Sequence, residues 1–354
     1  MRRTKGKKLS RRKFIKKSIG TAVGVSLAVK SGYGMDFESK EKSKVLEVFH
    51  PNVISKNRKI DQAIVRRMIQ QGMSGLTNSK NPWMQFIHPG DRVGLKINTL
   101  GRPLLYTHDE LIQAIVEELK DIGVKENNII VWDRYERHML KSKFTLNTSE
   151  KGIRVYGTDT RIGGKKRLDS DVVYRSDLDN SEKRNPENST DSTFSSIFTQ
   201  ECDKIINLAI LKDHGLAGVT LCLKNLAYGI SENNARFHGP EHIGPFISEF
   251  CTHPLLKKKV VLHIIDGLEG CFDGGPVPDN TNNLFTPKKL WLGTDPVALD
   301  TVGRRVIETE RKKRGLPSLQ ETGRPIDHIE LSAAQGVGTC KPDKIDLKKI
   351  QLEE

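Results

Sequence analysis

The chain has 354 residues, with 58 Lys or Arg, 44 Asp or Glu and a formal net charge of +14. Eleven basic residues and no acidic ones lie in residues 1–34, which leaves 47 bases and 44 acids for the rest of the chain. A surface near +3 lacks the excess of positive charge that nucleic-acid binding requires, so no nucleic-acid partner is expected. The length suits one large domain or two closely packed lobes.

Residues 1–34 are typical of an export signal. Residues 10–16, SRRKFIK, resemble the twin-arginine motif, and a short apolar segment follows at residues 19–29. That segment is too short to span a bilayer comfortably, so no integral membrane span is expected in the mature chain. We expect delivery to the bacterial periplasm by the twin-arginine translocase, with the signal either cleaved near Met35 or retained as an anchor. A basic amphipathic tail is the alternative interpretation.

The five cysteines indicate neither a metal cluster nor a disulfide scaffold. No two of them are fewer than twenty residues apart, and no C-x-x-C occurs. We therefore expect no iron–sulfur cluster and no zinc ribbon. The cysteine pattern leaves open whether one disulfide forms after export. The phosphate-binding and dinucleotide-binding glycine motifs are absent as well, and so is the G-x-S-x-G elbow.

Residues 35–44 predict a linker, and residues 45–354 predict a single large α/β domain. Its sheet should be mostly parallel, built from βαβ units with helices on both faces, and two lobes around one crevice are an alternative. A strand–helix–strand unit is expected over residues 92–132. Its helix should begin at the capping-box pair Thr107 and Glu110 and end at Gly123.

The other elements follow from hydrophobic periodicity and turn signals. An exposed excursion is expected at about residues 135–200, because residues 177–196 contain hardly any apolar side chain. Thr294 or Asp295 should cap a helix that begins at Pro296. The remaining strands are expected at residues 45–49, 153–156, 172–174, 205–211, 260–265, 289–292 and 345–350, and the remaining helices at residues 60–69, 245–251 and 329–334.

The stretch from residue 203 to residue 229 carries the densest set of candidate functional residues. An apolar run at residues 205–211 predicts a strand buried on both faces, and Lys212, Asp213 and His214 follow it directly. A second apolar run precedes Lys224 and Asn225. The alternative is structural: solvated lysines, with Asp213 and His214 capping a turn.

Polar residues also follow the other predicted strands. If the sheet is parallel, all these residues share one edge and line one crevice, where ligands bind in open α/β sheets. The residues concerned are Lys96, Asn98, Asp133, Arg134, Asp213, His214, Asp266 and Asp295.

Two ligand classes fit such a crevice. Carboxylates and imidazoles suit a divalent metal, and its candidate ligands are Asp213, His214 and His238. Lysine and amide side chains suit a carboxylate or phosphate on a small molecule. The candidate ligand-binding residues are Lys96, Asn98, Lys212, Asn225 and Asp266, and the candidate catalytic residues are His214 and Lys224.

Several segments resemble the family called domain of unknown function 362. They are VGLKIN at residues 93–98, LKDH at 211–214, LKNL at 223–226, DGL at 266–268 and DPVALD at 295–300. The resemblance covers most of residues 45–340 and implies the fold class and the motif positions. It implies no reaction, because the family has no settled activity.

A looser, local resemblance is to the nickel-pincer lactate racemase. That enzyme has a His, a Lys ten residues later and another His around a cofactor bound to the Lys. His214 and Lys224 have this spacing, whereas the third histidine, His238 or His242, is displaced and Leu221–Leu223 replaces the Gly-Gly before the lysine. The resemblance implies an isomerase-like reaction as one hypothesis.

Three functions therefore stay open at this point. The first is an exported enzyme or cofactor-binding protein of unknown reaction. The second is a non-catalytic periplasmic binding or accessory protein that holds a metal or an anion in the same crevice. The third is the racemase-like enzyme.

Overall fold

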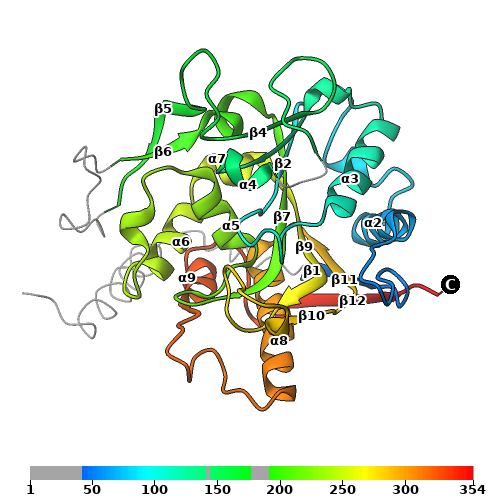
Figure 1. The fold of residues 1–354 in the computed structure, drawn as a ribbon, viewed down its shortest axis with the longest axis vertical. Coiled ribbons are helices and arrows are strands. Elements are labelled where there is room, and N and C mark those ends of the chain that lie inside the picture. The colour runs from blue at the N-terminus through cyan, green and yellow to red at the C-terminus, as the bar shows by residue number, and fades with distance from the viewer. Residues whose placement is uncertain (1–41, 141–143, 177–190, 354) are drawn as a thin grey trace, which may run out of the picture. The chain divides into compact units, whose positions relative to one another are not determined.

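A central sheet of ten strands runs through the domain (Figure 1). The structure is a computed structural model that describes residues 42–140, 144–176 and 191–353. The predicted signal at residues 1–34 and residues 35–41 of the predicted linker lie outside the described residues. Residues 42–354 form one compact unit. No helix within the described ranges is long and apolar enough to cross a bilayer.

The main path of the sheet has the order β12-β1-β11-β9-β7-β2-β3-β4. Two short strands, β8 and β10, pair with β7 and β9, and β5 and β6 form a separate two-stranded sheet. The strands are β1 Ser43–Phe49, β2 Val93–Lys96, β3 Ile129–Asp133, β4 Arg154–Gly157, β5 Leu168–Tyr174, β6 Ser192–Ser195, β7 Lys204–His214, β8 Gly218–Val219, β9 Val260–Cys271, β10 Leu284–Phe285, β11 Lys289–Gly293 and β12 Ile345–Gln351.

Helices cover both faces of this sheet, as predicted (Figure 1). They are α2 Gln62–Thr77, α3 Asp109–Asp121, α4 Glu136–Met139, α5 Leu221–Ile230, α6 Ile243–Cys251, α7 Pro254–Lys259, α8 Pro296–Lys313 and α9 Asp327–Ala334. Strand β7 shows how the two layers arise. Its side chains alternate between faces, so Ile206 and Leu208 pack in the core beneath α2 and α3, whereas Ile205 and Ala209 pack beneath α5 and α8.

The pairing confirms a mostly parallel α/β sheet. Strands β9, β7, β2, β3 and β4 run parallel to one another, and β2, α3 and β3 form the predicted βαβ unit. Strand β11 departs from this pattern, because it is antiparallel to both β9 and β1.

The reversal of β11 corrects one prediction about the crevice. Residues after β11 lie at the opposite edge of the sheet from those after β9, so Asp295 cannot join Asp266. The Asp295 carboxylate instead accepts hydrogen bonds from the backbone N–H groups of Val297 and Ala298, at 2.9 and 3.0 Å, and from the Ser43 hydroxyl at 2.6 Å. The predicted N-cap of α8 is confirmed.

One local prediction about α3 was wrong for an identifiable reason. The capping box of Thr107 and Glu110 does not form, because His108 is the N-cap residue of α3. The Thr107 hydroxyl instead donates to the Leu208 carbonyl at 3.0 Å and accepts from the Asn98 N–H at 2.9 Å. The predicted helix end is confirmed, since Gly123 follows α3 with a positive φ of 92°.

The predicted excursion at residues 135–200 is not wholly exposed. The side chains of Tyr156, Phe194 and Phe198 are buried in the core, and Phe194 stacks on Phe250 with ring centroids 4.8 Å apart. A few aromatic residues within a polar stretch are therefore enough to anchor it. Residues 177–190, the most polar part, lie outside the described residues.

The start of α5 is held by a residue from another helix. Its own N-cap residue, Thr220, makes no capping hydrogen bond with its side chain. The carboxylate of Asp300, fully buried in α8, accepts from the backbone N–H groups of Cys222 and Leu223 at 2.7 and 2.9 Å. Burial raises the pKa of Asp300 to about 7, although these hydrogen bonds oppose the rise.

We expect Asp300→Leu to lower the free energy of unfolding by about 2–4 kcal/mol, because two buried N–H groups lose their acceptor. Asp300→Asn should cost clearly less, since its side-chain oxygen can still accept. Urea unfolding of both variants measures the difference. Equal stability of wild type and Asp300→Leu would show that this capping contact does not hold α5.

Candidate functional site

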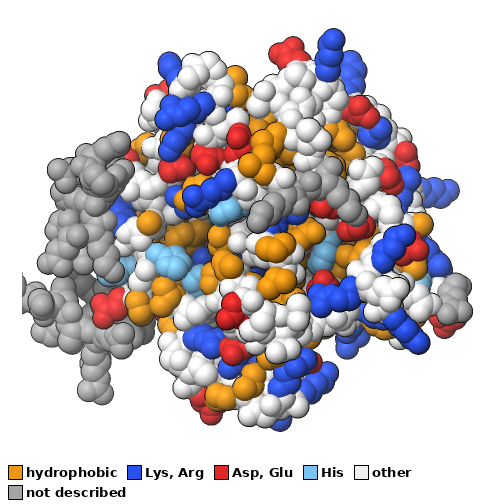
Figure 2. Space-filling view, in the orientation of Figure 1, with side chains coloured by type: hydrophobic (Ala, Val, Ile, Leu, Met, Phe, Trp, Pro, Cys, Tyr) orange, Lys and Arg blue, Asp and Glu red, His pale blue; other side chains and the backbone are white. Residues whose placement is uncertain are grey.

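A cavity of about 560 Å³ lies where β2, β3 and β7 meet α5. Figure 2 shows histidine side chains beside apolar ones to the left of the middle of this face, over the regions labelled α5 and α6 in Figure 1. Seven of the predicted site residues line the cavity. They are Lys96, Asn98, Lys212, His214, Lys224, Asn225 and His238.

The structure places two predicted site residues elsewhere. Lys212 and His214 point into the cavity from alternate positions of β7, so Asp213 between them points away. Its carboxylate accepts from the Gly275 N–H and from the Arg324 guanidinium, both at 2.8 Å.

Asp266 is the second residue outside the cavity. Its carboxylate accepts from the backbone N–H of His108 and contacts that residue's Nδ1, both at 2.8 Å. Burial alone would lower the pKa of His108, but the carboxylates of Asp266 and Glu269 outweigh burial and raise this pKa to about 10. Asp266 therefore belongs to a buried ion pair and not to the site.

A buried ion pair forms the floor of the cavity. The Lys96 amine, which is fully buried, donates to the Asp133 carboxylate and to the Ile97 carbonyl, both at 2.7 Å. Asp133 also accepts from the Thr99 N–H and hydroxyl. Burial lowers the pKa of Lys96, although the Asp133 carboxylate opposes this change. For Asp133, burial alone would raise the pKa, but the positive charge of Lys96 and the hydrogen bonds from Lys96 and Thr99 outweigh burial and lower it.

A chain of amides orients the second lysine. The Lys212 amine donates to Asn98 Oδ1 at 2.8 Å, Asn98 donates to Asn225 Oδ1 at 3.0 Å, and Asn225 donates to Asn207 Oδ1 at 2.8 Å. The other acceptor of Lys212 is the carbonyl of Pro276 at 3.1 Å. Both acceptors of Lys212 are neutral, and burial lowers its pKa to about 8.

Lys224 has neither a carboxylate nor a hydrogen-bond acceptor within the described part of the chain. It projects from the first turn of α5, only 6% exposed, with its Nζ 4.3 Å from the centre of the Tyr228 ring. Burial, together with the positive charges of Lys212 and Arg134, lowers the pKa of Lys224 to about 7. The alternative of a solvated lysine is therefore wrong for Lys224.

His214 is held as a neutral hydrogen-bond donor. Its Nδ1 accepts from the backbone N–H groups of Leu216 and Ala217, both at 3.0 Å. Two donors aimed at Nδ1 assign the ring proton to Nε2, which is buried without a partner among the described residues. Burial and the charge of Lys224 lower the pKa of His214 further, so the ring stays neutral.

His238 lies beside His214 on the more exposed side of the cavity. Its ring centroid is 5.2 Å from that of His214 and 5.5 Å from that of Tyr228. Partial burial and the charge of Lys224 lower the pKa of His238 to about 4. Within residues 42–140, 144–176 and 191–353, no group of three or more His, Cys, Asp or Glu side chains is arranged to hold a metal ion.

The site lies on a segment that matches a known family. Residues 93–305 match the family described as Domain of unknown function (DUF362), and this segment is more than half of the chain. The chain belongs to the DUF362 family. All seven predicted residues that line the cavity fall within the matched segment. No curated protein matches the chain.

Arg134, which was predicted at a strand end, also lines this DUF362 site and donates to Asn234 Oδ1 at 2.7 Å. Tyr228, which lines the cavity one helical turn after Lys224, was missing from the predicted set. The spacing of Lys224 and Tyr228 could have indicated this pair once α5 was recognised. His328, from α9, does not line the cavity but is fully buried, and neither of its ring nitrogens has a hydrogen-bond partner within the described residues. No sequence pattern predicts the position of His328.

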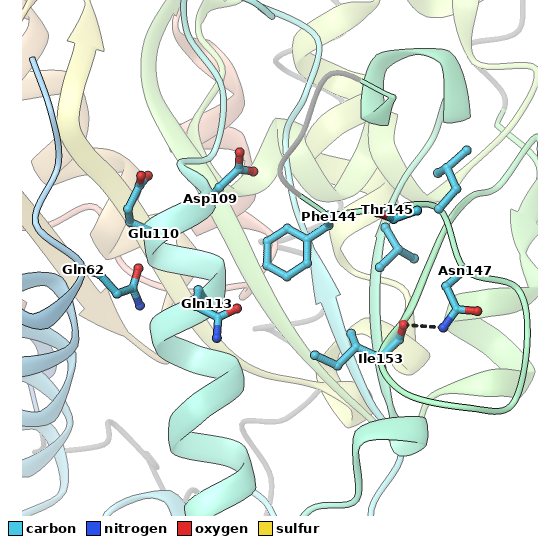
Figure 3. A pocket seen from close by; sticks show the side chains of 10 residues that line it. Gln62, Asp109, Glu110, Gln113, Phe144, Thr145, Asn147 and Ile153 are labelled. Carbon is cyan, nitrogen blue, oxygen red and sulfur yellow. Dashed lines mark hydrogen bonds between the residues drawn. The ribbon is translucent and has the colours of Figure 1, made fainter.

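A second cavity, of about 670 Å³, lies between α3 and the segment before β4 (Figure 3). Figure 3 shows Gln62 and Gln113 facing it from the helices, and Asn147 on the far side donates to the Ile153 carbonyl at 2.8 Å. Among the residues that the structure describes, no lysine, arginine or histidine lines it. It lacks the buried cationic groups of the first cavity, which we therefore take as the functional site.

We expect Lys224→Met to stabilise the ligand-free protein. At pH 7 the melting temperature should rise by about 2–4 °C, the shift that roughly 1 kcal/mol produces, because the variant buries no unpaired amine. The folded-state pKa of Lys224 lies below its unfolded value of 10.5, so the wild type gains stability as the pH rises from 7 towards 10. Lys224→Met should lack that part of the gain. Scanning calorimetry at several pH values tests both points, and a variant less stable than wild type at pH 7 would contradict them.

Proposed function

We propose that this protein binds a small molecule with a carboxylate or phosphate group in the cavity between β7 and α5. Lys96 pairs with the carboxylate of Asp133, and Arg134 lies 3.7 Å from that of Glu232. Lys212, in contrast, donates to the neutral oxygens of Asn98 and Pro276. The observation that carries the proposal is Lys224, only 6% exposed, whose amine has no hydrogen-bond acceptor among the described residues. A bound anion would supply the missing partner.

His214 supports an anion over a cation. A metal ion needs a lone pair, and the Nδ1 lone pair of His214 already accepts two backbone hydrogen bonds. The Nε2–H group that remains is a donor, which suits an oxygen of the ligand. The metal alternative makes a distinct prediction, namely a stoichiometric metal that is lost in His214→Ala.

An enzyme and a non-catalytic binding protein would both use this cavity. The enzymatic version is favoured by Lys224, because an amine with a pKa of about 7 exchanges protons readily at neutral pH. Turnover on a panel of carboxylated and phosphorylated substrates separates the two versions.

We expect sulfate to bind the wild-type protein and to bind Lys224→Met at least about tenfold more weakly, a change of roughly 1.4 kcal/mol. Lys348→Met, on the exposed strand β12, removes the same charge away from the cavity and should bind as wild type does. Sulfate keeps its charge across the range, so wild-type affinity should fall between pH 7 and 9 as Lys224 loses its proton. Isothermal titration calorimetry measures these affinities. Equal affinity in all three proteins would refute the proposed site.

We also propose export by the twin-arginine translocase, supported by the SRRKFIK motif and the short apolar segment behind it. Replacing Arg11 and Arg12 with Lys should strand the precursor in the cytoplasm. A control that replaces Lys7 and Lys8 with Arg keeps the twin pair and should be exported. Immunoblots of periplasmic and cytoplasmic fractions decide the matter. Undiminished delivery of the twin-arginine variant, or delivery through the general secretory channel, would count against this route.

A further inference from the structure

The cavity contains a nucleophile, the Lys224 amine, together with a hydrogen-bond donor, the His214 Nε2–H group. Simple anion binding needs no nucleophile. We infer that Lys224 forms a Schiff base with the carbonyl group of an anionic oxo compound, such as a 2-oxo acid. The inference rests on the proposed function, because the anionic group of the compound would be held by the basic side chains of the same cavity. It names the substrate class that those side chains serve.

Lys224 is the lysine of the cavity that can act as a nucleophile. The amine of Lys96 is engaged by Asp133 and the Ile97 carbonyl, and that of Lys212 by Asn98 and Pro276. Lys224 contacts the face of Tyr228 and has no anion or acceptor in the described chain. Such burial beside other cations favours the uncharged amine, the form with a free lone pair.

The position of this amine is fixed by the fold. Lys224 lies in the first turn of α5, and Asp300 holds the two preceding backbone N–H groups, those of Cys222 and Leu223. Asn225, the next residue, is bonded on both sides, to Asn98 and to Asn207. A nucleophile on a turn fixed in this way loses little freedom when it reacts.

His214 supplies the group that a reacting carbonyl needs. As nucleophilic attack proceeds, negative charge develops on the carbonyl oxygen, and a fixed donor there stabilises the transition state. Because the backbone hydrogen bonds to Nδ1 place the ring proton on Nε2, the Nε2–H group is the donor that we assign to this role. A neutral imidazole that polarises a carbonyl keeps its own proton, so His214 acts here as a donor.

The chemistry balances without a further reagent. The lone pair of Nζ forms a bond to the carbonyl carbon, and the π electrons move to the oxygen, which takes up a proton as the nitrogen loses one. The resulting carbinolamine then expels its hydroxyl group as water while the nitrogen loses its second proton. The products are an imine and one water molecule. A cavity of about 560 Å³ lies in the range that holds small ligands.

The test traps the imine by reduction. The full-length protein is incubated with pyruvate or 2-oxoglutarate and cyanoborohydride, and its intact mass is measured before peptide mapping. We expect one reduced adduct per chain on Lys224, with none in Lys224→Met. Lys348→Met should react as wild type does, and acetate, which lacks a ketone, should give no adduct. Labelling spread over surface lysines and unchanged in Lys224→Met would overturn the inference.

Lys224→Arg separates this inference from the proposed function. Arginine keeps the positive charge, so sulfate should still bind, but it cannot form the imine. If wild type binds sulfate and forms no adduct, the Schiff-base inference fails and the anion site stands. If wild type neither binds sulfate nor forms an adduct, both fail. His214→Gln, checked for folding by its melting temperature, should form the adduct at least about tenfold more slowly. An unchanged rate would overturn the role given to His214.

Discussion

Three buried lysines surround one cavity, and within the described residues a single carboxylate, that of Asp133, pairs with one of them. Burying an ammonium group without an opposite charge is unfavourable, and the lowered pKa values of Lys212 and Lys224 reflect this cost. The two core layers on either side of the sheet must offset it. The electrostatic character of the site therefore depends on how the rest of the domain packs.

The asparagines of the site explain how the lysines stay positioned without being neutralised. Asn98, Asn225 and Asn207 form a continuous row of amide hydrogen bonds that links the segment after β2 to α5 and β7. Each oxygen in this row accepts a bond, and none carries a charge. An aspartate at position 98 would hold Lys212 equally well but would cancel the positive potential that a ligand meets. Amides thus provide geometry while the lysines provide charge.

Sequence reasoning located most of the site because polar residues follow buried strands in a parallel sheet. Lys96, Asn98, Lys212 and His214 were found in this way, and the pattern placed Asp213 and Asp266 with them. The structure separates these two, because Asp213 points to the other side of β7 and Asp266 is paired with His108. Side-chain alternation and a distant partner decide such cases, and neither is visible from spacing within one motif. The antiparallel direction of β11 was equally hidden, since a strand of five residues reads the same in either direction.

The position of β1 has a consequence for how the chain is made. Strand β1 is the first strand along the chain, yet its two neighbours in the sheet are β11 and β12, at residues 289–293 and 345–351. While the chain is being synthesised from its N-terminus, the backbone donors and acceptors of β1 have no partner strand until nearly the whole sequence has emerged. Both edges of β1 are therefore open to wrong pairing during translation. This side of the sheet can be completed only after residues 289–351 have been made, and a nascent chain that stops before residue 345 leaves one edge of β1 uncovered.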